Sequence, residues 1–366
     1  MATREQIWNT YVAETIQALA PILKKGGYIL DNEQPHVVGE RFLMQAVTTT
    51  SGKKLILLGT RIADRKRVVI KVSNEKAGIS ELKEERKVRH ALKAIRFAYR
   101  TFNSPKELFW GKKKGYAMFI QEFLPNSPTF LERPVKEQFD LALSAFKGQE
   151  GAHATTYAHQ RFARRYFNEK KAGDYITSFE GFVQYAEQNR IAEDLFKLLQ
   201  VTLMYLKENK TDIERYQGFL THTDFVPHNF RVIDDSIYLL DHSSIRFGNK
   251  HEGWARFLNF MTLYNPDLEE GFALYMRENR SLEERHSLKL MRLYRLGEII
   301  YYYITAEERS SGDLKMLNHE RIYFWGCVLK RILHDEKLRT NEREAYIKKR
   351  DALRSPEEKM RQKGLH

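Results

Sequence analysis

The chain has 366 residues, 42% of them hydrophobic and 12% aromatic, which excludes a disordered chain and is enough for two lobes with cores of their own. Its single cysteine, Cys327, excludes an internal disulfide framework, and no apolar run reaches the length of about eighteen residues that a membrane span needs. The net charge of +13 favours an anionic partner such as a nucleotide, nucleic acid or an anionic surface, although a solvated basic face explains the charge as well.

The N-terminal residues, MATREQIWNT, carry charge at once and lead into no apolar segment, so we expect no signal peptide and a cytoplasmic location. Residues 3–24 then follow the period of an amphipathic helix. The apolar positions near one face are Ile7, Tyr11, Ile16, Leu19 and Leu23. We interpret residues 1–35 as a helical extension that packs on the first lobe and carries no chemistry.

Residues 41–72 change to the period of β-strands. Three β-prone runs, at 41–49, 55–61 and 67–72, are joined by short turns, and the first turn contains Ser51 and Gly52. Three consecutive runs of this kind predict an antiparallel meander. The third run, Val-Val-Ile-Lys-Val, carries Lys71, which, taken alone, could be a strand lysine that faces water.

Residues 80–99 predict a helix capped by Ser80. Its apolar stripe consists of Leu82, Val88, Leu92, Ile95 and Tyr99, and Glu85 falls on the same stripe. A carboxylate that points inward along an apolar face needs a partner, and Lys71 on the preceding strand is the natural one. Glu81, one turn earlier, is the second choice, and Glu85 could also lie at the helix edge in water.

Residues 115–124 form an apolar strand that runs into Pro125-Asn126-Ser127-Pro128, a change in composition that is typical of a hinge between lobes. The hinge divides a first lobe, 36–124, from a helical second lobe, 125–340, which a charged tail, 341–366, follows. Within the second lobe, residues 147–172 are basic and aromatic. They could form the wall of an acceptor pocket, contact nucleic acid, or be an ordinary solvated helix face.

Residues 218–243 contain the strongest cluster of polar side chains. Two short β-prone runs lie on either side of Asp234-Asp235-Ser236, so 230–240 predicts a hairpin. A hairpin brings its two ends together, and it therefore places Asn229 beside Asp241. With the carboxylate of Asp224, these oxygen ligands suit Mg²⁺ and a bound phosphate.

The pattern His-x-Asp-x4-Asn, here His222, Asp224 and Asn229, followed by a hairpin and Asp241, resembles the catalytic segment of the protein-kinase-like fold in its aminoglycoside and choline kinase branch. The resemblance implies an α+β, bilobal protein-kinase-like fold with an antiparallel sheet plus one helix in the N-lobe and a mostly helical C-lobe. It implies that Asp224 is the catalytic base, that Asn229 and Asp241 hold Mg²⁺, and that His222 is structural and bonds the backbone near Asp241.

The same resemblance implies that ATP is the phosphoryl donor. Lys71 would grip the phosphates while paired with Glu85, and the backbone at Ser51 and Gly52 would cover them. The carbonyl of Gln121 and the amide of Phe123 would bind adenine. The sequence departs from the family in three places: the phosphate turn has a single glycine, the metal motif reads Asp-His-Ser, and the segment EGWARFLNF lacks the usual aspartate.

We therefore expect an enzyme that transfers the γ-phosphoryl group of ATP to a hydroxyl of a small molecule. The basic segment 147–172 would repel a polycation, so we expect a neutral or anionic acceptor. Two other readings stay open. One is a metal-dependent hydrolase on His222, Asp224, His228 and His242. The other is a non-catalytic kinase-like module that binds nucleotide and an anionic partner such as nucleic acid.

Overall fold

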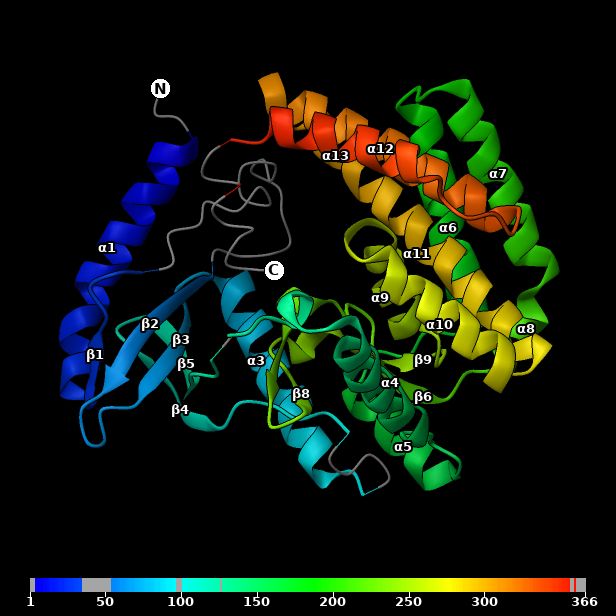
Figure 1. The fold of residues 1–366 in the computed structure, drawn as a ribbon. Helices are drawn as coiled ribbons and strands as arrows, with labels where there is room; N and C mark the ends of the chain where they lie inside the picture. The colour runs from blue at the N-terminus through cyan, green and yellow to red at the C-terminus, as the bar shows by residue number, and fades with distance from the viewer. Residues whose placement is uncertain (1–3, 35–53, 97–100, 126, 356–358, 360–366) are drawn as a thin grey trace.

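A five-stranded antiparallel sheet forms the first lobe, and its strands are ordered β1-β2-β3-β5-β4. The computed structural model describes residues 4–34, 54–96, 101–125, 127–355 and 359. The strands are β1 (Tyr28–Leu30), β2 (Leu55–Arg61), β3 (Arg67–Ser73), β4 (Glu107–Lys113) and β5 (Tyr116–Glu122). Figure 1 shows helix α1 along one side of this sheet and helix α3 between the sheet and the helical part of the molecule.

The two faces of β3 explain why one lysine can enter the interior. Val68, Ile70 and Val72 pack with Leu19 and Leu23 of α1 (Arg4–Lys25), as the apolar stripe of that helix predicts. The alternation of a strand sends Lys71 to the opposite face, toward α3. Helix α3 spans Lys76–Ala94 and places Leu82 against Ala117 and Phe119 of β5.

Two predictions for this lobe need correction or lie outside the described residues. Helix α3 begins at Lys76 after an N-cap at Glu75, so Ser80 is a residue of its second turn and not its cap. The run at 41–49 lies outside the described residues. Within them, the partner of β2 on its outer side is β1, with Tyr28 opposite Arg61, a strand that the sequence pattern did not predict.

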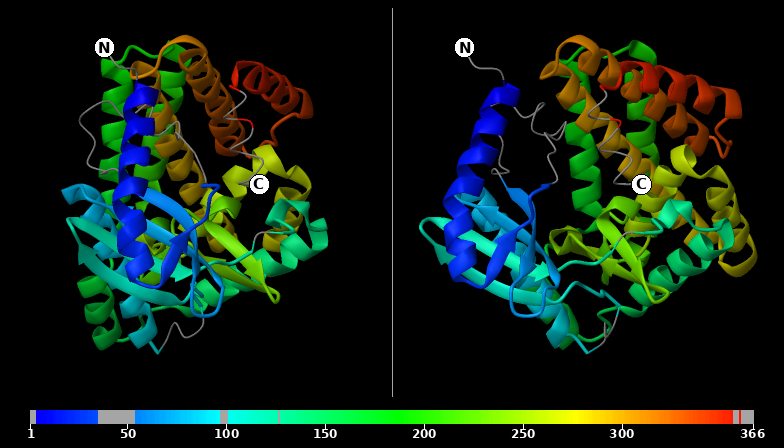
Figure 2. Two further views of the ribbon diagram at one scale, coloured as in Figure 1. Left: turned by 90° about the vertical axis from the view of Figure 1, so that its left-hand side faces the viewer. Right: turned by 60° about the vertical axis from the view of Figure 1, so that its left-hand side comes forward.

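The second lobe is mostly helical. Its helices are α4 (Val135–Gly151), α5 (Tyr157–Tyr166), α6 (Ala172–Gln188), α7 (Glu193–Glu208), α8 (Lys210–Arg215), α9 (Glu252–Tyr264), α10 (Pro266–Asn279), α11 (Leu282–Glu308), α12 (Gly312–Leu333) and α13 (Thr340–Leu353). Two short strand pairs lie within it: β6 (Phe219–His222) with β9 (Ile245–Gly248), and β7 (Phe230–Ile233) with β8 (Ser236–Leu239). Figure 2 shows the two lobes side by side, as the bilobal prediction requires.

Aromatic side chains fix the polar segment within this lobe. Phe146 of α4 stacks on Trp254 of α9, with ring centroids 4.3 Å apart, and Phe225 packs on Phe146 at 5.0 Å. Phe225 and Phe230, each 1% exposed, directly follow Asp224 and Asn229 in the chain. Because both rings are anchored in the core, the two polar residues before them are held at its edge.

The charged tail predicted from residue 341 is better ordered than its composition indicates. Residues 341–353 lie in α13, where Tyr346 is buried and stacks on Phe324 of α12 with ring centroids 4.1 Å apart. None of the helices in the described part of the chain is both long and apolar enough to cross a membrane.

Candidate active site

The buried ion pair expected between Lys71 and Glu85 is present. The Lys71 Nζ lies 2.5 Å from Oε1 of Glu85, and the two side chains are only 8% and 2% exposed. Glu81, the second choice, instead pairs with Lys54 at 3.4 Å near the surface. Glu85, the carboxylate on the apolar stripe of α3, is therefore paired with Lys71 of β3.

Lys71 also connects the two lobes. Its Nζ donates a hydrogen bond of 2.9 Å to the carbonyl oxygen of Leu240, which lies 169 positions further along the chain and directly before Asp241. The ammonium group is therefore held between a carboxylate of the first lobe and the polar segment of the second. Nothing in the local sequence pattern indicated this contact.

The predicted hairpin over 230–240 is present as β7 and β8, and its turn is Asp234-Asp235, with Ser236 already in β8. Phe230 pairs with Leu239 and Ile233 with Ser236, while Asp234 and Asp235 adopt φ of 46° and 58°. Two successive positive φ values are typical of a tight two-residue turn, and aspartate tolerates them. At the other end, the Leu240 amide donates to the Asn229 carbonyl at 2.8 Å, so Asn229 and Asp241 lie at the mouth of the hairpin.

His222 makes the structural contact that the resemblance implied. Its Nε2 donates to the carbonyl oxygen of Asp241 at 2.6 Å, and the residue is completely buried. Burial lowers the pKa of His222, so the imidazole is neutral and carries its proton on Nε2. Gln149 of α4 fixes the strand that carries His222, since its Oε1 accepts a hydrogen bond of 2.9 Å from the His222 amide.

Asp224 is held by two donors and remains partly exposed. Its Oδ2 accepts from Nδ2 of Asn229 at 2.7 Å, and its Oδ1 accepts from Nε of Arg256 at 2.7 Å, while 33% of the side chain stays accessible. Burial would raise the pKa of Asp224, but the charges of Arg256 and His228 outweigh it and hold the pKa well below its usual range. Asp224 is thus a carboxylate at neutral pH.

Arg256 was missed by the sequence analysis. It lies on α9, in the segment EGWARFLNF that departs from the family by lacking an aspartate. The available signal was an arginine in this segment, fifteen residues after Asp241, but only the packing of α9 against β6 brings it to Asp224.

Asp241 is oriented by two serines. Its Oδ1 accepts from the amide and hydroxyl of Ser243 at 3.0 and 2.5 Å, and Oδ2 accepts a longer bond of 3.3 Å from Ser244. Burial opposes ionisation, yet the hydrogen bonds of Ser243 and the charge of Lys71 lower the pKa of Asp241 below its ordinary value. The site therefore contains a second ionised carboxylate.

The donor set at the hairpin mouth fits Mg²⁺. Asn229 uses its amide nitrogen for Asp224, which leaves its side-chain oxygen without a hydrogen bond from the described residues. The long bond from Ser244 is the one hydrogen bond to the Oδ2 of Asp241 from the part of the chain that the structure describes. Two hard oxygen atoms, one of them charged, are ligands that Mg²⁺ takes together with phosphate oxygens.

The four residues of the hydrolase reading do not form a zinc site. Among the described residues, the group of metal-ligating side chains within 4.8 Å of one another is Glu150, His251 and Glu284, which contains none of the four. Lys250 lies 2.5 Å from Glu284, and Arg280 lies 2.7 Å from Glu150, so two cations already balance these carboxylates. His222, for its part, is committed to the Asp241 carbonyl.

The structure describes both residues that the resemblance assigned to adenine, Gln121 and Phe123. Gln121 lies inside β5, opposite Val69 on one side and Glu107 on the other, and is therefore part of the sheet rather than of the connection. The Phe123 amide donates to the Arg67 carbonyl at 3.3 Å, so it is not free for adenine. Ser51 and Gly52, expected over the phosphates, lie outside the described residues.

The Lys71–Glu85 pair leads to a prediction about stability. Replacing either residue with Ala should lower the free energy of unfolding by about 3–5 kcal/mol, because the other charge is left buried and unpaired. The double variant should lose clearly less than the sum of the two. Denaturant titration of a double-mutant cycle measures this coupling.

The chain offers a matched control for this cycle. Lys54 and Glu81 lie near Lys71 and Glu85 but form a more exposed pair, at 3.4 Å, so their coupling should stay below about 1 kcal/mol. Strict additivity at Lys71 and Glu85 would contradict the buried contact.

Comparison with known proteins gives a result at the level of the fold. No protein-family profile matches the sequence, and no curated protein matches it either. The structure is similar to that of the aminoglycoside phosphotransferase APH(4)-Ia, with a TM-score of 0.57 and 13% identity over 86% of this chain and 98% of that one.

Two further solved structures are similar to this chain to about the same degree. A macrolide 2'-phosphotransferase, MphH from Brachybacterium faecium, has a TM-score of 0.54 and 13% identity over 83% of this chain and 97% of its own. A thermostable APH(4)-Ia mutant in a ternary complex with ADP and hygromycin B has a TM-score of 0.53 and 15% identity over 79% and 98%. The chain thus has the protein-kinase-like fold of these phosphotransferases, which confirms the predicted fold class.

Proposed function

We propose that this protein is an ATP-dependent phosphotransferase that moves the γ-phosphoryl group to a hydroxyl of a small molecule. The observation that carries the proposal is the convergence of both lobes on one place. Lys71, paired with Glu85, bonds the carbonyl before Asp241, while Asp224 and Asn229 bond each other at the mouth of the same hairpin. Solved structures of the same fold hold ADP, or AMP-PNP, together with hygromycin B.

The residues divide the chemistry among them. Asp224 accepts a hydrogen bond from the attacking hydroxyl and receives its proton as the oxygen bonds to the γ-phosphorus and the bond to the bridging oxygen of ADP breaks. Lys71 offsets the negative charge of the phosphates. Asn229 and Asp241 would hold Mg²⁺, which would offset negative charge on the phosphates of ATP. Because its pKa is depressed, Asp224 acts mainly by orienting the hydroxyl, and it takes the proton late.

The charges around Asp224 support a neutral or anionic acceptor. Arg256, His228 and Arg295 are the groups whose charges act on Asp224. The Nη atoms of Arg256 have no partner among the described residues, so they are available to an acceptor oxygen. This support is more direct than that from segment 147–172, where Arg164 pairs with Glu169 and the half-buried Lys170 lies over the rings of Tyr175 and Tyr294.

The test is release of ADP in the presence of Mg²⁺ and three kinds of candidate acceptor: neutral sugars and amino alcohols, phospho-sugars, and a kanamycin-like polycation. We expect neutral or anionic compounds to raise ADP release about tenfold or more over the rate with water, because an oriented hydroxyl replaces a freely diffusing one.

The outcomes of this assay distinguish the proposed enzyme from the alternative functions. Efficient phosphorylation of the polycation, weakening as salt rises, would refute the predicted acceptor charge and leave the phosphotransferase in place. Tight ATP binding without turnover across a broad acceptor panel would favour the non-catalytic nucleotide-binding module instead. The fold comparison gives no support to a nucleic acid partner.

A further inference from the structure

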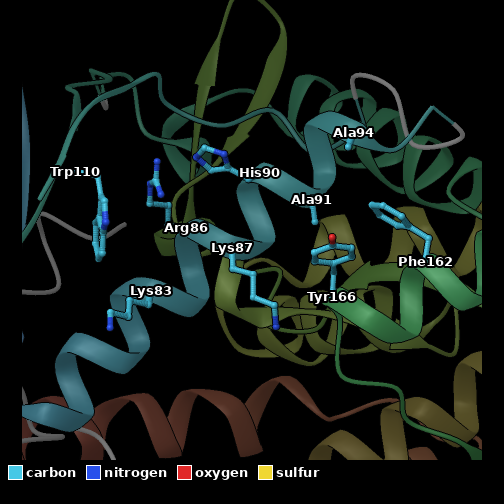
Figure 3. Close-up of a pocket in the computed structure, with 9 residues that line it drawn as sticks. All are labelled: Lys83, Arg86, Lys87, His90, Ala91, Ala94, Trp110, Phe162 and Tyr166. Atoms are coloured by element: carbon cyan, nitrogen blue, oxygen red, sulfur yellow. The ribbon is translucent and has the colours of Figure 1, made fainter.

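A cavity lies on the far side of α3 from Lys71. It has a volume of about 430 Å³, and its walls come from α3, β4 and α5. Figure 3 shows Trp110 of β4 on one side of α3 and Phe162 and Tyr166 of α5 on the other, with Lys87 of α3 between them. A cavity of this size holds a small organic molecule.

The cavity carries positive charge that the protein does not neutralise. Arg86 and His90 both lie against Glu107, at 2.8 and 3.1 Å. Lys83 has no ion pair with any described residue, and Lys87 has only an exposed contact of 3.4 Å with Glu84. These two lysines, in a lining that also contains Arg86 and His90, favour an anion.

The rest of the lining favours a flat ring. Trp110, Phe162 and Tyr166 are all partly buried; Arg86 lies 5.5 Å from the centre of the Trp110 ring, and Phe162 and Tyr166 contact each other with ring centroids 4.7 Å apart. An anionic group beside the lysines and an aromatic ring against Trp110, or against Phe162 and Tyr166, would use both features of the cavity together.

The cavity and the Lys71–Glu85 pair share helix α3. At about 100° per residue, Lys83, Lys87, His90 and Ala94 lie within about 40° of the direction opposite to Glu85. The same helix therefore presents Glu85 to the proposed ATP site and the cavity wall to the other side. A shift of α3 that changes the cavity also changes the position of Glu85.

The cavity also spans both lobes. Helix α3 and β4 belong to the first lobe, whereas the ends of the α5 segment are tied to the second: the Ala154 amide bonds Gly218, and the Lys170 amide bonds Phe247 at 2.8 Å. A ligand that touches Trp110 or Lys87 and also Phe162 or Tyr166 therefore connects the lobes behind the proposed active site.

We propose that this cavity binds a small molecule that carries an anionic group on an aromatic ring, and that its occupancy raises the affinity for ATP by fixing α3 against the second lobe. The binding part is independent of the proposed function, and the coupling part rests on it. Coupling between two sites is reciprocal, so ATP must raise the affinity for the cavity ligand by the same factor.

The probe for the experiment is 1-naphthyl phosphate, titrated by calorimetry into the full chain, with 1-naphthol and inorganic phosphate as ring-only and anion-only comparisons. We expect the probe to bind at least about tenfold more tightly than either part. The double variant Lys83→Gln, Lys87→Gln should weaken it about fivefold to tenfold, the loss expected from two partly exposed charges. The matched control is Lys24→Gln, Lys25→Gln, two exposed lysines at the end of α1, which should leave it unchanged.

Coupling is read from ATP titrations with and without saturating 1-naphthyl phosphate. We expect about a fivefold gain in ATP affinity in the wild type, an equal gain for the probe with ATP present, and no gain in the Lys83/Lys87 variant. Probe binding that ignores the lysine variant, or that does not exceed phosphate and naphthol, overturns the site. Unchanged ATP affinity overturns the coupling. If ATP binds under neither condition while the probe still binds, the proposed function fails and the cavity site stands.

Discussion

Replacing Asp224 with Asn is expected to lower turnover by roughly two to four orders of magnitude, the size of the loss of a positioned base. The carboxylate lies between Asn229 and Arg256 at 2.7 Å from each, and no contact assigns it to the nucleotide, so ATP affinity should remain nearly unchanged. The measurements are steady-state ADP release with a productive acceptor and calorimetric titration of ATP.

The control for this substitution lies on the same hairpin. Asp235→Asn makes the same chemical change at the exposed turn, where asparagine also tolerates the φ of 58°, and it should leave turnover within a factor of two or so. If Asp224→Asn abolished ATP binding and left the residual turnover per bound ATP unchanged, Asp224 would belong to the nucleotide site and not to the base position.

The pH dependence of turnover by the wild type tests the depressed pKa of Asp224. Asp224 has a depressed pKa, so its carboxylate form persists at any pH above the ordinary carboxyl value of about 4, and no activity should be lost there through its protonation.

Replacing Asp241 with Asn is expected to cost about a hundredfold or more in turnover, because a charged metal ligand stabilises the transferring phosphoryl group by several kcal/mol. ATP affinity should fall as well, to the value that the wild type shows without Mg²⁺. Asparagine can keep an oxygen for the Ser243 hydrogen bonds, so the main change is the lost charge.

The reference for this experiment is the wild type titrated with ATP in the presence and absence of Mg²⁺. The proposed metal site requires clearly tighter binding with Mg²⁺, since the phosphates and the two ionised carboxylates otherwise repel each other. Equal affinities under both conditions would remove Asn229 and Asp241 from the metal-ligand role, whatever Asp241→Asn does to turnover.

The sequence determined the parts of this protein that depend on local periodicity and spacing. The Asp234-Asp235 turn set the register of the hairpin, and the register brought Asn229 next to Asp241. The interruption of an apolar stripe by Glu85, combined with a lysine on the neighbouring strand, was enough to predict a buried pair, because an unpaired internal carboxylate is too costly. These features require only a few neighbouring residues or one consistent helical face.

Only the tertiary structure decided the contacts that join distant elements. Three contacts depend on how the lobes and helices pack together. They are the hydrogen bond from Lys71 to Leu240, the ion pair of Arg256 with Asp224, and the stacking of Tyr346 on Phe324. The hydrogen bond from the Phe123 amide to the Arg67 carbonyl and the cavity between α3 and α5 depend on the same packing. Periodicity shows which face of an element is buried. The element that packs against this face is determined by the packing of all elements together, so a short stretch of sequence cannot predict it.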